Sequence, residues 1–218
     1  MQHKKKIDIK WLVLLAVFTA LAYVAVSLIR IPAVAFLKYE PKDVIIVISG
    51  LILGPLASLI VSFVTALLEM ITISDTGPIG CIMNLLSSAC YACTASMVYQ
   101  HKRTLSGAVT GLALGSVAMV AVMLLWNWLI TPLYMGVDRD VVIGMMVPVF
   151  LPFNAVKALL NSALVLCLYK PLITALRKAR LVQTPSTGEG SFQFGLYVLS
   201  AVILATGILM LLVLQGKL

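Results

Sequence analysis

Long apolar stretches, separated by short polar breaks, set the strongest limit on how this chain can fold. A bilayer core about 30 Å thick needs about 20 apolar residues per helix, and the sequence offers several such stretches. Its 218 residues are 61% hydrophobic and 11% charged, which leaves too little polar surface for a water-soluble domain. The stretches are apolar on nearly every side, whereas membrane β-strands alternate apolar and polar residues. The pattern predicts an all-α integral membrane protein.

The polar breaks divide the chain into seven predicted helices. They cover residues 11–29, 43–53, 55–73, 78–99, 107–130, 148 or 152 to 176, and 194–214. Arg30 and Pro32 end the first helix, Asp43 is expected to cap the second, and Gly54-Pro55 makes a tight turn into the third. Residues 1–180 therefore form one membrane domain, 181–193 a flexible polar linker, and 194–218 an additional C-terminal transmembrane helix.

The positions of Lys and Arg predict the orientation. Ten cations fall on the side of the N-terminus: Lys4, Lys5, Lys6, Lys10, Lys102, Arg103, Lys170, Arg177, Lys178 and Arg180. Five fall on the other side: Arg30, Lys38, Lys42, Arg139 and Lys217. Because cytoplasmic loops carry the excess of Lys and Arg, the chain is expected to be a multi-pass protein of the cell membrane with a cytoplasmic N-terminus.

Several function classes find no support in the residues. The net charge of +8 comes from clusters beside apolar spans, so nucleic acid is not an expected partner. Cys90 and Cys93 have the spacing of a redox motif but lie in an apolar stretch, where small apolar filler is the simpler interpretation. His3 and His101 lie at the expected cytoplasmic surface, so no metal site is predicted. The sequence has no glycine-rich phosphate loop, so partners would have to hydrolyse any ATP.

Lys157 is the most informative single residue, because it lies inside a predicted transmembrane helix. Burying its ammonium group costs several kcal/mol unless it has a partner. Asn154 and Asn161 share its helix face at helical spacing. One interpretation is a ligand site, and the alternative is a polar contact between helices in which Lys157 pairs with Glu69.

The predicted topology brings further polar residues to the same depth. Asn84, Asn127, Asn154 and Lys157 all fall in the outer half of the bundle, which predicts an outward-facing cup. Other residues that could line it are Ser87, Ser88, Tyr91, Trp126, Trp128 and Tyr134, although Trp128 has the alternative role of an interface anchor. Asparagine offers donors and an acceptor, and lysine only donors, so the set suits a neutral ligand edge such as the pyrimidine edge of a flavin.

Three segments resemble a known family, the substrate-binding S components of energy-coupling factor (ECF) vitamin transporters. Phe36-Leu-Lys-Tyr-Glu-Pro-Lys-Asp43, running into Ser49-Gly-Leu-Ile-Leu-Gly-Pro55, resembles the loop and second helix of many S components. The segments Asn127-Trp-Leu-Ile-Thr-Pro-Leu-Tyr134 and Pro152-Phe-Asn-Ala-Val-Lys157 resemble the riboflavin-binding branch. The resemblance implies a six-helix S-component bundle, to which this chain adds its seventh helix.

The resemblance also implies a function and partners. The chain is expected to capture riboflavin from outside, as a transported ligand, with Asn127, Asn154 and Lys157 holding the flavin ring. It would dock on a transmembrane coupling subunit with two ATP-binding cassette ATPases, through the small-residue face of Ala16 and Ala20. The alternatives are an S component for thiamin, biotin or pantothenate, and an integral-membrane enzyme. The enzyme interpretation lacks a nucleophile with a base, a metal set or paired acids, since Asp138 and Asp140 are expected in a loop.

Overall fold

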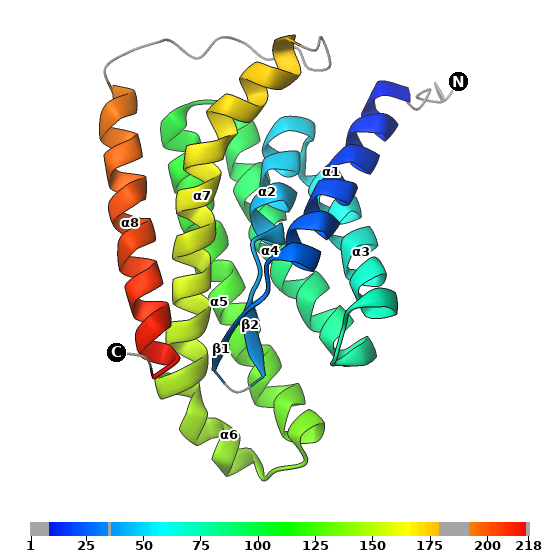
Figure 1. Ribbon diagram of the computed structural model, residues 1–218, viewed down its shortest axis with the longest axis vertical. Coiled ribbons are helices and arrows are strands. Elements are labelled where there is room, and N and C mark those ends of the chain that lie inside the picture. Colours follow the sequence, from blue (N-terminus) through cyan, green and yellow to red (C-terminus); the bar gives the residue numbers. More distant parts are fainter. Residues whose placement is uncertain (1–8, 35, 179–191, 217–218) are drawn as a thin grey trace.

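The computed structural model describes residues 9–34, 36–178 and 192–216, and it forms a bundle of helices with one small hairpin (Figure 1). The elements are α1 (Ile9–Leu28), β1 (Ile31–Val34), β2 (Leu37–Tyr39), α2 (Lys42–Leu53), α3 (Pro55–Thr72), α4 (Gly77–His101), α5 (Leu105–Met135), α6 (Arg139–Met145), a π-helical turn (Met146–Phe150), α7 (Leu151–Lys178) and α8 (Phe192–Leu214). The predicted linker residues 181–191, the cations Lys4, Lys5, Lys6, Arg180 and Lys217, and His3 lie outside the described residues.

The described helices have the length and composition of membrane spans. Five are long and apolar enough to cross a bilayer: α1, α3, α4, α5 and the helical stretch Arg139–Tyr169. Their outward faces carry large exposed apolar side chains, including Leu12, Leu133 and Val147. Such faces need lipid as their solvent, so the all-α membrane class predicted from the sequence is confirmed.

Helix α2 lies at the centre of the bundle and is too short to cross it. Its 12 residues span about 18 Å at 1.5 Å per residue. Nine of them are buried, among them Lys42, Asp43 and Val47, and the helix packs on α1, α3, α4 and α7. The antiparallel hairpin β1–β2 fills the depth that α2 leaves open, with Ile31 opposite Tyr39. The sequence predicted a plain loop here, and this hairpin was missed.

The position of the hairpin corrects two predictions about the start of α2. Pro41 is the N-cap residue, so Asp43 does not cap the helix; its side chain is fully buried instead. Lys42 was expected at the outer surface but is 1% exposed. Both errors have one cause, because the chain re-enters the bundle as a hairpin and starts α2 well inside it.

Helices α4 and α5 share the most extensive helix contact among the described elements, and glycines on α5 permit a close approach. A Cβ at Gly111 would lie 2.6 Å from the carbonyl oxygen of Ala95, and one at Gly115 would lie 2.7 Å from that of Tyr91. Small residues let two membrane helices approach in this way. The turn from α2 to α3 uses Gly54, whose φ of 106° is unfavourable for any residue with a side chain.

Two helices extend beyond their predicted ends. Helix α5 continues through Pro132 to Met135, so Tyr134 is helical. The chain is helical again from Arg139, which puts Asp140 in a first helical turn and not in a loop. Pro148 lies in the π-helical turn before α7, where its missing N–H interrupts the regular α-helical pattern. The sixth predicted helix is therefore a longer, interrupted one.

The predicted seventh helix exists as α8 and packs along α7 (Figure 1). It runs back toward the end of the bundle that carries the hairpin and α6, opposite the start of α1. Helix α8 therefore returns the chain to the hairpin end.

Candidate functional site

A cavity of about 250 Å³ lies between the hairpin and helices α4, α5 and α7. Its lining residues are Arg30, Phe36, Leu37, Lys38, Glu40, Asp75, Thr76, Met83, Asn84, Ser87, Met123, Asn127, Tyr134, Phe153, Asn154 and Lys157. The volume is near the lower end of the range for small-molecule sites, roughly 300–1,000 Å³. Asn84, Asn127, Asn154 and Lys157, which were predicted to line a common cup, all line this cavity.

Two asparagines form one side of the cavity, and each is oriented by its own helix. Asn127 on α5 donates from Nδ2 to the carbonyl oxygen of Met123 at 2.7 Å and accepts a bond from Thr131 at 2.9 Å. Asn154 on α7 donates from Nδ2 to the carbonyl oxygen of Phe150 at 2.8 Å. Each amide nitrogen carries a second N–H. The two amides are thus fixed in direction while keeping capacity for a ligand.

Lys157 completes this side and is anchored from below by Asp43. Its Nζ lies 2.9 Å from Oδ2 of Asp43, which is fully buried. Asp43 also accepts hydrogen bonds from Ser88 and from Asn161, the latter at 3.3 Å. The hypothesis that Lys157 pairs with Glu69 is therefore wrong. An ammonium group has three N–H donors, so Lys157 keeps donors for a ligand while its charge is neutralised.

Glu69 belongs to a second buried group of charges. Lys42 Nζ lies 2.5 Å from Oε2 of Glu69 and 2.7 Å from Oε2 of Glu40. Asn84 donates to the same oxygen of Glu69 at 3.0 Å, and Arg30 lies 3.0 Å from Glu40. Arg30, Lys42 and Lys157 thus face Glu40, Asp43 and Glu69, so the charges in and beneath the cavity balance. Burial of so many ions is sustained only when each has a close partner.

The hairpin side of the cavity is also charged but paired. Lys38 contacts Asp75 in the loop before α4, and this cation lowers the pKa of the Asp75 carboxyl. Burial alone would raise the pKa of Glu40, but Lys42, Lys157 and Arg30 hold it below its ordinary value. Asp75 and Glu40 are therefore ionised at neutral pH, and each forms an ion pair with a neighbouring cation.

Apolar and aromatic side chains form the remaining walls. Phe36 packs edge-on against Tyr134, with ring centroids 5.6 Å apart, and lies 6.2 Å from Phe150. Met83, Met123 and Phe153 complete the apolar lining. Aromatic faces and flexible methionine side chains suit a flat ring system, whose edge would meet the amides and the lysine.

Other residues predicted for the site lie elsewhere. Tyr91 is fully buried and its hydroxyl lies 2.7 Å from that of Ser162. Asn161 is also fully buried; it accepts from Tyr39 at 3.1 Å and holds Asp43, so it supports Lys157 from behind. Neither lines the cavity. Trp126 lines a smaller neighbouring pocket, and Trp128 is on the outside, 5.3 Å from the guanidinium of Arg139.

The sequence interpretation missed the residues that the hairpin brings to the site. Phe36, Leu37 and Glu40 line the cavity, although the segment was expected to be a loop. The role of Asp43 was missed as well, and one signal could have found it. A buried lysine needs a buried carboxylate, and Asp43 directly precedes an apolar stretch.

Comparison with known proteins places the chain in a family. The family model described as "ECF transporter, substrate-specific component" matches residues 10–169, which contain the whole cavity. The chain belongs to this family. Helix α8 lies beyond the matched residues. The family resemblance stated from the sequence is confirmed, as is the transport class.

Members of known function and structure resemble this S component over most of its length. The riboflavin transporter RibU of Staphylococcus aureus (strain TCH60) is 27% identical over 82% of this chain and 100% of its own. The riboflavin transporter FmnP of Bacillus subtilis (strain 168) is 26% identical over 79% of this chain and 98% of its own. The solved structure titled "Structure and mechanism of the S component of a bacterial ECF transporter" has a TM-score of 0.65 and 28% identity, and covers 77% of this chain and 98% of its own.

Proposed function

We propose that this S component binds riboflavin and delivers it to an ECF importer. The observation that carries the proposal is the meeting of Asn127, Asn154 and Lys157 in one cavity with aromatic walls. The pyrimidine edge of a flavin alternates carbonyl groups with an N–H, and these three side chains offer matching donors and an acceptor. The names of the two relatives agree with this ligand.

The paired charges around the cavity favour a neutral ligand. Arg30, Lys38 and Lys157 each have a carboxylate partner within the described residues. An anionic ligand would have to separate one of these pairs, which costs free energy. Riboflavin is neutral, and its ribityl hydroxyl groups can bond to Asn84 and Ser87 on the α4 side.

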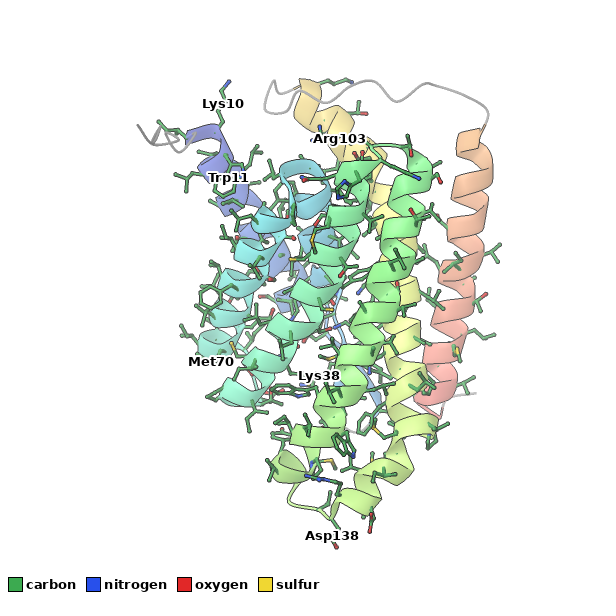
Figure 2. The ribbon with its side chains drawn as sticks, turned by 180° about the vertical axis from the view of Figure 1, so that it is seen from behind. Lys10, Trp11, Lys38, Met70, Arg103 and Asp138 are labelled. Carbon is green, nitrogen blue, oxygen red and sulfur yellow. The ribbon has the colours of Figure 1, made fainter. Side chains whose placement is uncertain are left out.

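We further propose that the cavity opens to the outside of the cell. Lys10 and Arg103 lie at one end of the bundle and Asp138 at the other (Figure 2). The cation-rich end is then cytoplasmic by the positive-inside rule. The hairpin lies toward the other end (Figure 1), and its residues Leu37 and Lys38 line the cavity, which could there capture a vitamin from outside.

Uptake would need partner proteins. The sequence has no phosphate-binding loop, so a coupling subunit and two ATP-binding cassette ATPases would supply the energy. Ala16 and Ala20 are exposed on α1, where a coupling-subunit helix could approach closely.

The absorption spectrum of the purified protein tests the ligand. A flavin carried through purification, or added and retained after desalting, gives visible bands at about one flavin per chain. Retention of thiamin, biotin or pantothenate in place of riboflavin would reject the flavin and leave the family membership intact.

A further inference from the structure

Helix α8 lies outside the residues matched by the family, yet it contacts the hairpin, whose strand β2 lines the cavity. Its buried side is a stripe at helical spacing: Ser200 and Gly207 are buried, and Leu204 lies between them. Gln215 follows directly after the helix on the same stripe. The remaining described side chains, such as Val202 and Leu209, are mostly exposed.

The first contact with the hairpin is a hydrogen bond. Nε2 of Gln215 donates to the carbonyl oxygen of Pro32 in β1. Pro32 lies opposite Lys38 in the hairpin register, and Lys38 lines the cavity. The end of α8 is therefore hydrogen-bonded to β1, the strand that pairs with the cavity-lining strand β2.

The second contact is apolar and reaches β2. Leu204 packs on a small cluster of Tyr39, Val156 and Leu160, which joins β2 to α7. Gly207 lets α8 come this close, because a Cβ there would lie 2.6 Å from Cδ2 of Leu160. Tyr39 in turn holds Asn161, which donates to Asp43, the partner of Lys157. Both strands of the hairpin are thus connected to α8.

We infer that α8 is a clamp that holds the hairpin over the cavity, with Gln215 and Gly207 as its positioning residues. The inference rests on the proposed function for its ligand, riboflavin. Phe36, Leu37 and Lys38 of the hairpin line the cavity, so contacts that restrain the hairpin should slow the release of a ligand held against these residues. Neither residue touches the cavity, so both would act through β1 and β2.

Two variants of the full chain test the clamp. Gln215→Met keeps the length of the side chain and removes the donor, and Gly207→Leu forces α8 away from Leu160. Their matched controls are Val213→Met and Ala205→Leu, at exposed positions of the same helix. In detergent, riboflavin dissociation measured after dilution should become about three- to tenfold faster in both variants, as expected from the loss of one hydrogen bond or its packing equivalent. The controls should match the wild type.

Hydrogen exchange of the ligand-free protein gives a readout that does not depend on riboflavin. The amides of Ile31, Ala33, Val34 and residues 36–39 should exchange faster in both variants, while those of α4 and α5 stay unchanged. Unchanged hairpin exchange, unchanged dissociation, or exchange that rises equally throughout the bundle would overturn the clamp. If Gly207→Leu fails to fold, Gln215→Met decides, because Gln215 lies past the helix end. If the wild type binds no riboflavin, the proposed function is wrong. The hydrogen-exchange result alone then tests whether α8 restrains the hairpin.

Discussion

At the scale of single residues, the site depends on buried ions that neutralise one another. Lys157 lines the cavity, and it is also the close cation of Asp43. Lys42 forms ion pairs with both Glu40 and Glu69. Removing one member of such a group leaves the others charged and without water, so the cost exceeds that of an ordinary polar contact.

Lys157→Met is therefore expected to lower both stability and affinity. It strands the Asp43 carboxylate, which should cost roughly 3–5 kcal/mol of folding free energy. It also removes a donor to the ligand, which should weaken riboflavin binding about tenfold or more. Ligand-free thermal unfolding and a riboflavin titration measure the two effects.

The double variant Lys157→Met with Asp43→Asn separates these roles. An asparagine keeps hydrogen-bonding capacity toward Ser88 and Asn161 and carries no charge, so stability should return most of the way. Affinity should stay low, since the ligand donor is still missing. A double variant as unstable as the single one would contradict the Asp43 pairing.

The partner of Lys157 could not be predicted from the sequence. The sequence identified Lys157 because a lysine inside an apolar helix needs a partner. Asp43 and Glu69 were both available carboxylates, and their depth decides between them. Asp43 lies deep because the hairpin fills the outer part of the bundle. The two strands have only four and three residues, which is too short for an alternating pattern that would predict a hairpin.

At the scale of elements, the hairpin connects the cavity to the buried charges. Glu40 at the end of β2 is held by Arg30 and Lys42, and its pKa is below the ordinary value. A carboxyl with a lowered folded-state pKa contributes stability above its unfolded pKa, about 4.3, and that contribution is lost as the pH falls through the folded pKa.

Glu40→Gln should therefore reduce the acid sensitivity of the fold. The melting temperature of the wild type should fall as the pH is lowered from 5 toward 3, which is about the range in which carboxyl groups titrate. The variant should start from a lower melting temperature at neutral pH and lose less over the same range. Thermal unfolding at a series of pH values measures this, and parallel curves for the two proteins would contradict the role of Glu40.

Helix α1 gives a second prediction at this scale. Ala16 and Ala20 are exposed, whereas Phe18 and Ala22 on the other side pack in the core. Replacing both alanines with leucine should suppress riboflavin uptake in cells that contain the coupling subunit and leave binding to the purified protein unchanged. Leu21→Trp, an exposed position away from this pair, is the control. Reduced binding in the double leucine variant would argue against a docking role.

Most helices could be predicted because membrane helices are recognisable in a sequence by their length and hydropathy. The ends were harder. Helix α5 runs past its predicted end at residue 130 and through Pro132, whereas Pro171 lies inside both the predicted helix and α7. Pro148 shows a third outcome, a π-helical turn that links α6 to α7. Neighbouring helices can compensate for the lost backbone hydrogen bonds, which proline content alone does not reveal.

At the scale of the whole molecule, α8 packs on α7 of the bundle that holds the cavity. Residues 10–169 carry the family match and every residue that lines the cavity, while α8 adds an outer layer on α7. Helix α8 runs back to the hairpin end of the bundle, opposite the start of α1 (Figure 1). We propose that this cavity holds riboflavin through the amides of Asn127 and Asn154 and through Lys157.

A competitive titration tests that claim most directly. Purified protein in detergent is titrated with riboflavin while flavin fluorescence is followed, alone and with excess thiamin, biotin or pantothenate. We expect saturation at about one riboflavin per chain, no effect of the other vitamins, and affinity about tenfold weaker for Asn127→Ala. Leu129→Ala, at an exposed neighbouring position, is the control. Displacement of riboflavin by another of these vitamins, or equal affinity in Asn127→Ala and the wild type, would contradict the claim.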